Sequence, residues 1–96
     1  MEPAFELNAS GQVSEVELRF SAKVAPFISE LIWHPSQRVS KKNSDGSITL
    51  TMRVAINEEI VRWILGYGSE CAVIRPAVLI DMLKNHLYSL KQYYNI

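Results

Sequence analysis

Several residue types and patterns are scarce in this chain of 96 residues, and each scarcity excludes a class of protein. Cys71 is the single cysteine, so no internal disulfide can form, which fits a reducing compartment. Lys plus Arg number 10 and Asp plus Glu number 10, so the chain has no net charge and is not a generally basic nucleic-acid binder. The chain has no apolar run near the length of a membrane span and no signal-peptide pattern. We therefore expect a cytoplasmic protein that does not enter a membrane.

The residues that are present are sufficient for one folded domain. Hydrophobic residues make up 48% and charged residues 21%, which is ordinary for a globular domain and too apolar for a disordered tail. Proline, asparagine, serine and glycine interrupt the first part of the chain. We predict a lead-in over residues 1–12 and a domain over residues 13–96.

Alternation of apolar and polar residues predicts two half-buried strands, over residues 16–24 and 48–54. Two weaker strands are predicted as well. Residues 37–43 are polar and basic, which is typical of a guarded edge strand, and residues 43–46 have the composition of a hairpin turn. Residues 71–74 form a short apolar run.

Three segments have helical spacing. The first covers residues 27–32 and ends at His34-Pro35, since the residue before a proline leaves the helical region. The second begins after Asn57, a good N-cap, and ends at Gly66. The third is a long final helix whose apolar stripe contains Leu79, Met82, Leu83, Leu87, Leu90 and Tyr94.

The order strand, helix, strand, strand, helix, strand is that of the ferredoxin-like split β-α-β fold. We therefore predict an α+β domain with an antiparallel sheet in the order 4-1-3-2. Both of the first two helices are expected on one face of this sheet. The final helix is an addition to the pattern.

The sequence shows no catalytic constellation. His34 and His86 have no further ligands at metal-binding spacing, and Cys71 is best explained as a small buried side chain. The segment 66–68 contains two glycines, but it follows a helix, whereas a phosphate loop precedes one. We expect no enzyme activity, no metal site and no cofactor.

One constellation suggests a ligand site. With the apolar halves of the strands under the helices, the open sheet face is expected to carry Arg19, Lys23 and Arg53, with Arg38 from the edge strand and Glu17 alone opposing them. Such a cationic face suits phosphates or carboxylates. Three interpretations stay open: a solvated face, a site for a small anionic ligand, and a docking surface for an acidic neighbouring domain.

The final helix is the second candidate site. Its residues Leu83, Leu87, Leu90 and Tyr94 form a candidate assembly interface. The alternative is that this stripe covers the core of its own domain, as amphipathic helices usually do.

Several segments, taken in order, resemble a known family. They are residues 16–21, 32–37, 45–47, 50–54, 61–68 and 72–76, which read VELRFS, IWHPSQ, DGS, LTMRV, VRWILGYG and AVIRP. This combination resembles the C-terminal extension (WCX) domain of bacterial WYL-domain transcriptional regulators. The resemblance runs from about Val13 to Tyr94.

The resemblance implies a larger protein and its partners. The chain would be a fragment of a regulator that also contains a helix-turn-helix domain and a WYL domain, and it would contact DNA only through the former. The family implies a ligand such as a nucleotide, an oligonucleotide or another anionic molecule, together with homodimerisation. None of the family's DNA-reading or WYL-motif residues has a counterpart in these 96 residues.

We accordingly expect a non-catalytic regulatory, ligand-sensing and oligomerisation domain of a WYL-family regulator. The alternative is a stand-alone ferredoxin-like module that binds a small anionic metabolite. An upstream reading frame encoding a helix-turn-helix and a WYL segment would favour the first. A stop codon directly upstream, together with a metabolite that shifts the melting temperature, would favour the second.

Overall fold

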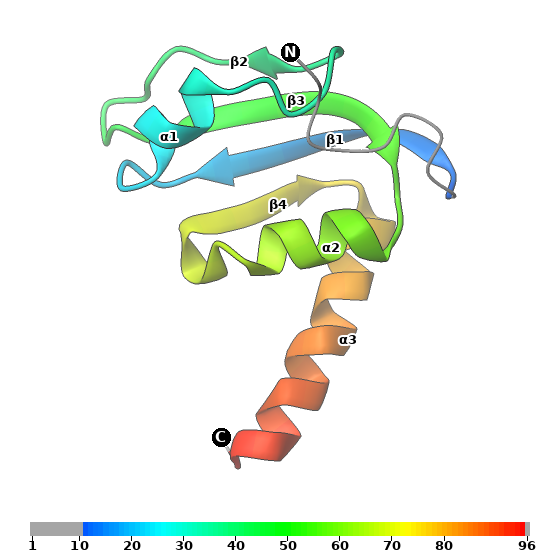
Figure 1. Cartoon of the computed structure of the whole chain (residues 1–96). Helices are drawn as coiled ribbons and strands as arrows, with labels where there is room; N and C mark the ends of the chain where they lie inside the picture. Colours follow the sequence, from blue (N-terminus) through cyan, green and yellow to red (C-terminus); the bar gives the residue numbers. More distant parts are fainter. Residues whose placement is uncertain (1–10, 96) are drawn as a thin grey trace.

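The computed structural model describes residues 11–95 and has an α+β architecture (Figure 1). Its elements, in chain order, are β1 (Val13–Phe20), α1 (Ala25–Glu30), β2 (Arg38–Val39), β3 (Ile48–Ala55), α2 (Glu58–Leu65), the 3₁₀ helix η1 (Gly68–Glu70), β4 (Cys71–Arg75) and α3 (Ala77–Tyr94). The predicted fold class, an antiparallel sheet with helices and an added C-terminal helix, is confirmed for these residues.

The sheet is organised around its two long strands. β1 and β3 pair antiparallel over their whole length, from Val13 opposite Ala55 to Phe20 opposite Ile48. β4 pairs with the other side of β1, and β2 pairs with the other side of β3, both antiparallel. The strand order is therefore β2-β3-β1-β4. Counted from the β4 edge, this is the order 4-1-3-2 of the ferredoxin-like pattern.

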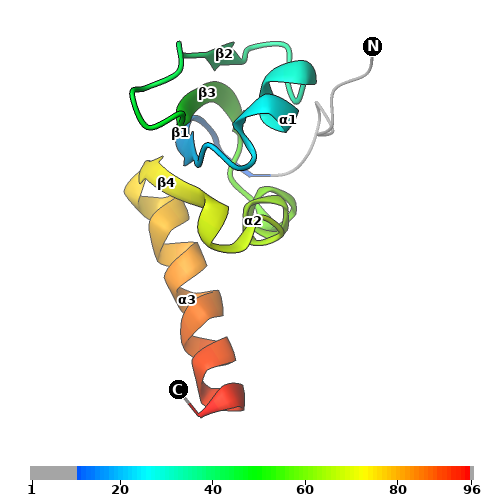
Figure 2. The same cartoon turned by 90° about the vertical axis from the view of Figure 1, so that its left-hand side faces the viewer.

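The core lies on one face of this sheet. Alternate residues point to opposite faces of a strand, so the apolar half of each long strand is buried. The buried strand residues are Val16, Leu18, Phe20, Ile48, Leu50, Met52 and Val54. α1 and α2 both lie over this face (Figure 2), and Ile28, Ile60 and Ile64 complete the core from the helices.

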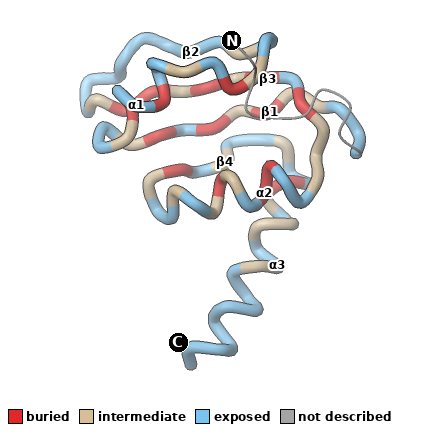
Figure 3. Tube along the Cα trace, viewed as in Figure 1, coloured by how far each residue is buried: buried red, intermediate tan, exposed pale blue. Residues whose placement is uncertain are grey.

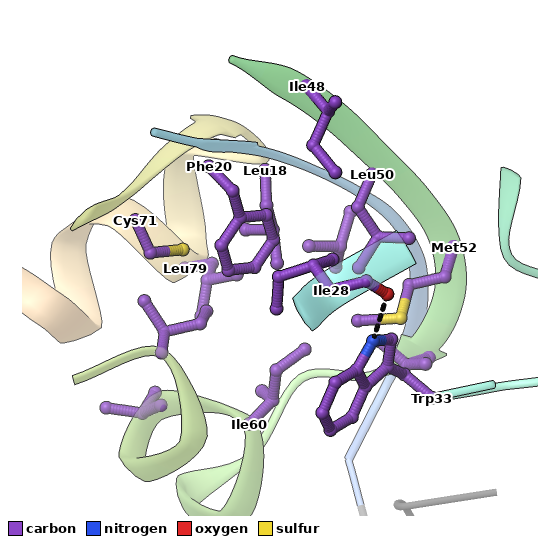
Figure 4. Close-up of a cluster of buried hydrophobic side chains, with 14 of the residues drawn as sticks. Leu18, Phe20, Ile28, Trp33, Ile48, Leu50, Met52, Ile60, Cys71 and Leu79 are labelled. Atoms are coloured by element: carbon purple, nitrogen blue, oxygen red, sulfur yellow. Dashed lines mark hydrogen bonds between the residues drawn. The ribbon is translucent and has the colours of Figure 1, made fainter. Parts of the chain in front are cut away.

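Aromatic contacts join the two helices to the sheet. The ring centroid of Phe20 lies 5.8 Å from that of Trp63 and 5.4 Å from that of Tyr67, both in edge-to-face geometry. Trp33 lies 5.0 Å from Trp63 by ring centroids, and its Nε1 donates a hydrogen bond of 3.0 Å to the carbonyl of Ile28 (Figure 4). Trp33 thereby ties the end of α1 to α2.

The predicted hairpin turn and the predicted N-cap of the second helix are both confirmed. Gly46 adopts a φ of 85° in the hairpin between β2 and β3, a conformation that glycine tolerates best. The Asn57 side chain accepts a hydrogen bond of 3.2 Å from the backbone N–H of Ile60, which caps the first turn of α2.

Two predicted strand limits are wrong. β1 ends at Phe20, because the backbone turns at Ser21, whose carbonyl accepts hydrogen bonds from the N–H groups of Val24 and Ala25. The edge strand predicted over residues 37–43 is a strand only at Arg38–Val39, with one further backbone hydrogen bond of 2.9 Å from the N–H of Ser40 to the carbonyl of Thr49. Lys41 and Lys42 follow in an exposed loop, since no buried side chain anchors that segment to the sheet.

The long helix α3 packs on the domain only at its beginning. Leu79 is buried, and Met82 and Leu83 are half-buried against the core. From Leu87 onward every residue is exposed through Asn95 (Figure 3). The second half of α3 therefore extends away from the rest of the molecule.

The burial of neighbouring side chains predicts that two alanine substitutions lower the free energy of unfolding by different amounts. Leu50 is fully buried on β3, and Val39 is the exposed residue opposite it on β2. We expect Leu50→Ala to lower the free energy of unfolding by about 2–5 kcal/mol, because it removes buried methyl groups and leaves a cavity. Val39→Ala should change it by less than about 1 kcal/mol. Urea denaturation measures both free energies, and equal costs would contradict the burial of Leu50 in the middle of the sheet and the exposure of Val39 at its edge.

Candidate functional site

The open face of the sheet carries the charged residues of the two long strands. Glu15, Glu17 and Arg19 of β1 alternate with the buried residues, and Arg53 does so on β3 together with threonines. α1 and α2 lie on the opposite side of the sheet (Figure 2). Side chains on this face are therefore available to a ligand or a neighbouring domain.

Ion pairs on this face neutralise part of its positive charge. A nitrogen of Arg19 lies 2.7 Å from a carboxylate oxygen of Asp45. Arg75, the last residue of β4, lies 2.5 Å from Glu15 and 2.9 Å from Glu17. The prediction that Glu17 alone opposes the cations is wrong, because Glu15 shares its face and Asp45 reaches Arg19 from the hairpin turn.

Asp45 also shapes the hairpin turn. Its Oδ1 accepts hydrogen bonds from the N–H of Ser47 at 2.9 Å and from the hydroxyl of Ser47 at 2.6 Å. These hydrogen bonds, with a smaller effect of Arg19, lower the pKa of the Asp45 carboxyl below its usual range. The carboxylate is therefore ionised at neutral pH and remains a partner for Arg19.

The four predicted cations do not form one cluster. Lys23 lies in the turn after β1 and not on the sheet, because β1 ends at Phe20. Arg19 is held by Asp45. Arg38 and Arg53 do lie together, since Arg38 is opposite Thr51 in register and Arg53 is two residues further along β3.

Arg38 and Arg53 line a shallow hollow of about 320 Å³. Glu15, Ser36 and Thr51 contribute to its wall. Within residues 11–95, neither arginine forms an ion pair. This part of the open face therefore keeps its positive charge.

A second hollow, of about 390 Å³, lies at the other end of the face. Its lining includes Arg19, Ser21, Asp45 and Glu70. Arg19 is paired with Asp45, and the Ser21 hydroxyl donates a hydrogen bond to the Glu70 carboxylate. The charges there are already satisfied, so this hollow is the poorer anion site.

The predicted interface residues of α3 fall into two groups. Leu83 is half-buried against the domain's own core, so it is not available to a partner. Leu87, Leu90 and Tyr94 are exposed by 55%, 44% and 71%. The stripe thus covers its own core at one end and is uncovered at the other.

His86 marks the boundary between the two halves of α3. Its Nε2 lies 3.0 Å from a carboxylate oxygen of Glu58, the first residue of α2. The residues that follow it are exposed. Tyr93, which was not among the predicted interface residues, is 83% exposed and lies three residues beyond Leu90 on the same side of the helix.

Cys71 and the potential metal ligands are the remaining reactive side chains. Cys71 is buried, and this burial raises the pKa of its thiol to about 12, so the thiol is protonated at neutral pH. Over residues 11–95, the structure contains no group of three His, Cys, Asp or Glu side chains that could hold a metal ion.

No helix in the described part of the chain combines the length and the apolar character needed to span a membrane.

Comparison with known families confirms the resemblance seen in the sequence. The family model described as the WCX domain matches residues 12–89, which is most of the chain. No curated protein matches the sequence. The matched range includes the whole sheet, α1 and α2, and most of α3.

The burial of Cys71 predicts a slow reaction with alkylating reagents. With a pKa of about 12 in place of the ordinary 9.0, the thiolate fraction at pH 8 falls by about three orders of magnitude. We expect iodoacetamide to label the folded chain far more slowly than the chain unfolded in urea, as followed by mass spectrometry. Cys71→Ser is the unlabelled control, and equal rates in both states would contradict the burial.

The same pKa shift predicts how the free energy of unfolding changes with pH. The folded chain binds the thiol proton more tightly than the unfolded chain does. The stabilising contribution is therefore complete below pH 9 and is lost as the pH rises toward about 12. Chemical denaturation of the wild type and of Cys71→Ser at several pH values above 9 measures this loss. A wild type that gains stability relative to Cys71→Ser as the pH rises would contradict the shift.

Proposed function

Because the chain belongs to the WCX domain family, we propose that it is a non-catalytic regulatory domain of a WYL-type transcriptional regulator. In this proposal it pairs with a second copy through the exposed half of α3 and senses an anionic ligand on the open sheet face. The observation that carries the proposal is the uncovered apolar side of α3. DNA would be bound by a helix-turn-helix domain of the same regulator, in the cytoplasm, with the WYL domain as its neighbour.

The geometry of α3 explains why its own domain does not cover it. The helix has 18 residues and is about 27 Å long, and it crosses α2 instead of running alongside it, so its second half extends past the domain (Figures 1 and 2). Leu83, Leu87, Leu90 and Tyr94 follow at steps of four, three and four residues, so they lie on one side of the helix. This spacing is the one found where two helices pack side by side.

The exposed side chains are sufficient for a modest interface. Burying an aliphatic side chain contributes about 1.5–3 kcal/mol, so Leu87, Leu90 and Tyr94 from two copies together contribute on the order of 10 kcal/mol. The loss of translational and rotational freedom on association costs about 4–15 kcal/mol. We therefore expect a dimer of the isolated chain that dissociates on dilution.

A contact on the sheet connects the proposed ligand face to α3. Arg75 is the last residue of β4, and α3 begins two residues later at Ala77. The Arg75 guanidinium binds Glu15 and Glu17 on the open face. A ligand that changes the contacts of these carboxylates would also change the contacts of Arg75, close to the start of α3. The ligand-free and ligand-bound domains would then differ at α3, and regulation requires two states that differ in this way.

The assembly proposal predicts a loss of self-association when charge is placed on the uncovered side. In the double variant Leu87→Asp, Leu90→Asp, two carboxylates would have to be buried without partners. We expect sedimentation equilibrium to give a mass that rises with concentration for the wild type and stays at one chain for the double variant. Circular dichroism should show the same folded domain in both, since these side chains are exposed.

Tyr88 provides the matched control. It is exposed by 65% and lies on the opposite side of α3 from Leu90, so Tyr88→Asp should self-associate like the wild type. A wild-type chain that stays a monomer at millimolar concentration would contradict the proposal. Self-association of the double variant would contradict the proposal as well.

A further inference from the structure

Arg38 and Arg53 are two guanidinium groups that share one hollow and have no ion-pair partner among residues 11–95. The other two arginines of the open face are both paired, Arg19 with Asp45 and Arg75 with two glutamates. Arg38 is opposite Thr51, so Arg38 and Arg53 are diagonal neighbours on the open face, where two like charges repel each other. An anion between Arg38 and Arg53 would remove this repulsion.

Arg53 has no ion pair in the described part of the chain because another arginine competes for the carboxylate opposite it. Glu15 lies directly opposite Arg53 in the β1–β3 register. Its carboxylate instead binds Arg75 at 2.5 Å from the other side of β1. Glu15 still lines the hollow, but its charge is shared with Arg75, so Arg53 remains available.

The backbone beside the two arginines is firmly held. The Ser36 hydroxyl accepts a hydrogen bond of 2.8 Å from the N–H of Arg53 and donates one of 3.3 Å to its carbonyl. The Gln37 side chain accepts hydrogen bonds from the N–H groups of Trp33 and His34 and donates one to the carbonyl of Leu31. The segment that leads into Arg38 is therefore fixed to β3 before any ligand arrives, which lowers the entropy cost of binding.

We propose that Arg38 and Arg53 form a binding site for a phosphate group carried by a small molecule or free in solution. A guanidinium donates two parallel hydrogen bonds to a tetrahedral oxyanion, and two such groups match the double charge of a phosphate monoester. The Thr51 hydroxyl, on the same wall of the hollow, supplies a further donor. This inference rests on the proposed ligand-sensing role and narrows it from a whole sheet face to two residues.

The test is isothermal titration calorimetry of the chain at low ionic strength with four probes: inorganic phosphate, glycerol 3-phosphate, glycerol and acetate. We expect the two phosphates to bind and glycerol and acetate not to bind. Binding of the ester alone assigns the site to phosphorylated molecules, and binding of inorganic phosphate alone assigns it to the free ion. Absence of binding by both phosphates, or equal binding of acetate, would overturn the proposal.

Variants locate the site. Arg38→Gln and Arg53→Gln should each weaken phosphate binding by about tenfold or more, since each removes a charged donor. The double variant should abolish it. Arg62→Gln makes the same charge change on the exposed surface of α2 and should bind like the wild type. A loss in Arg19→Gln as large as that in Arg53→Gln would show that binding follows the charge of the whole face, and would overturn the two-residue site.

The failure of this inference and of the assembly proposal can be told apart. Sedimentation of the Arg38→Gln, Arg53→Gln double variant should show the self-association of the wild type, because the hollow and the uncovered half of α3 share no residue. A wild type that self-associates but binds no phosphate would contradict the phosphate site alone. A wild type that binds phosphate but stays a monomer would contradict assembly alone.

Discussion

The antiparallel pairing of β1 with β3 is the constraint on which the rest of the structure depends. Its register decides at once which residues are buried and which are charged and open, because a slip by one residue would turn every side chain to the other face. β4 and β2 are each attached only to one of these two strands. The same register places Glu15 opposite Arg53 and so determines the charge distribution of the open face.

Local sequence patterns were sufficient to predict the elements that depend on neighbouring residues. The alternation in β1 and β3, the cap at Asn57 and the turn at Gly46 are properties of a few adjacent positions. The charge pairs could not be predicted in this way, because Arg75 and Glu15 are 60 residues apart and meet only through the sheet register. Lys23 was misplaced for a related reason: its segment alternates like a strand, but the hydrogen bonds to Ser21 end β1 before it.

The apolar stripe of α3 shows a second limit of sequence patterns. Periodicity identifies the side of a helix that avoids water, but it does not say how far the domain beneath that side extends. Leu83 and Leu90 belong to the same stripe, yet Leu83 packs against the core while Leu90 is 44% exposed. The difference arises because α3 crosses α2 near the contact of His86 with Glu58 and then extends past the domain (Figures 1 and 2).

The zero net charge of the chain is distributed unevenly across the sheet. On the β1 and β4 side, one arginine, Arg75, holds the two carboxylates of Glu15 and Glu17. On the β2 and β3 side, Arg38 and Arg53 form no ion pair with any residue between 11 and 95. Glu15 belongs to both sides, since it lines the hollow and binds Arg75. In the phosphate site proposed at Arg38 and Arg53, the bound anion would share the hollow with the Glu15 carboxylate, which Arg75 already holds at 2.5 Å. In that proposal, Glu15 is the residue that connects the bound charge on the open face to Arg75, which precedes the start of α3 by two residues.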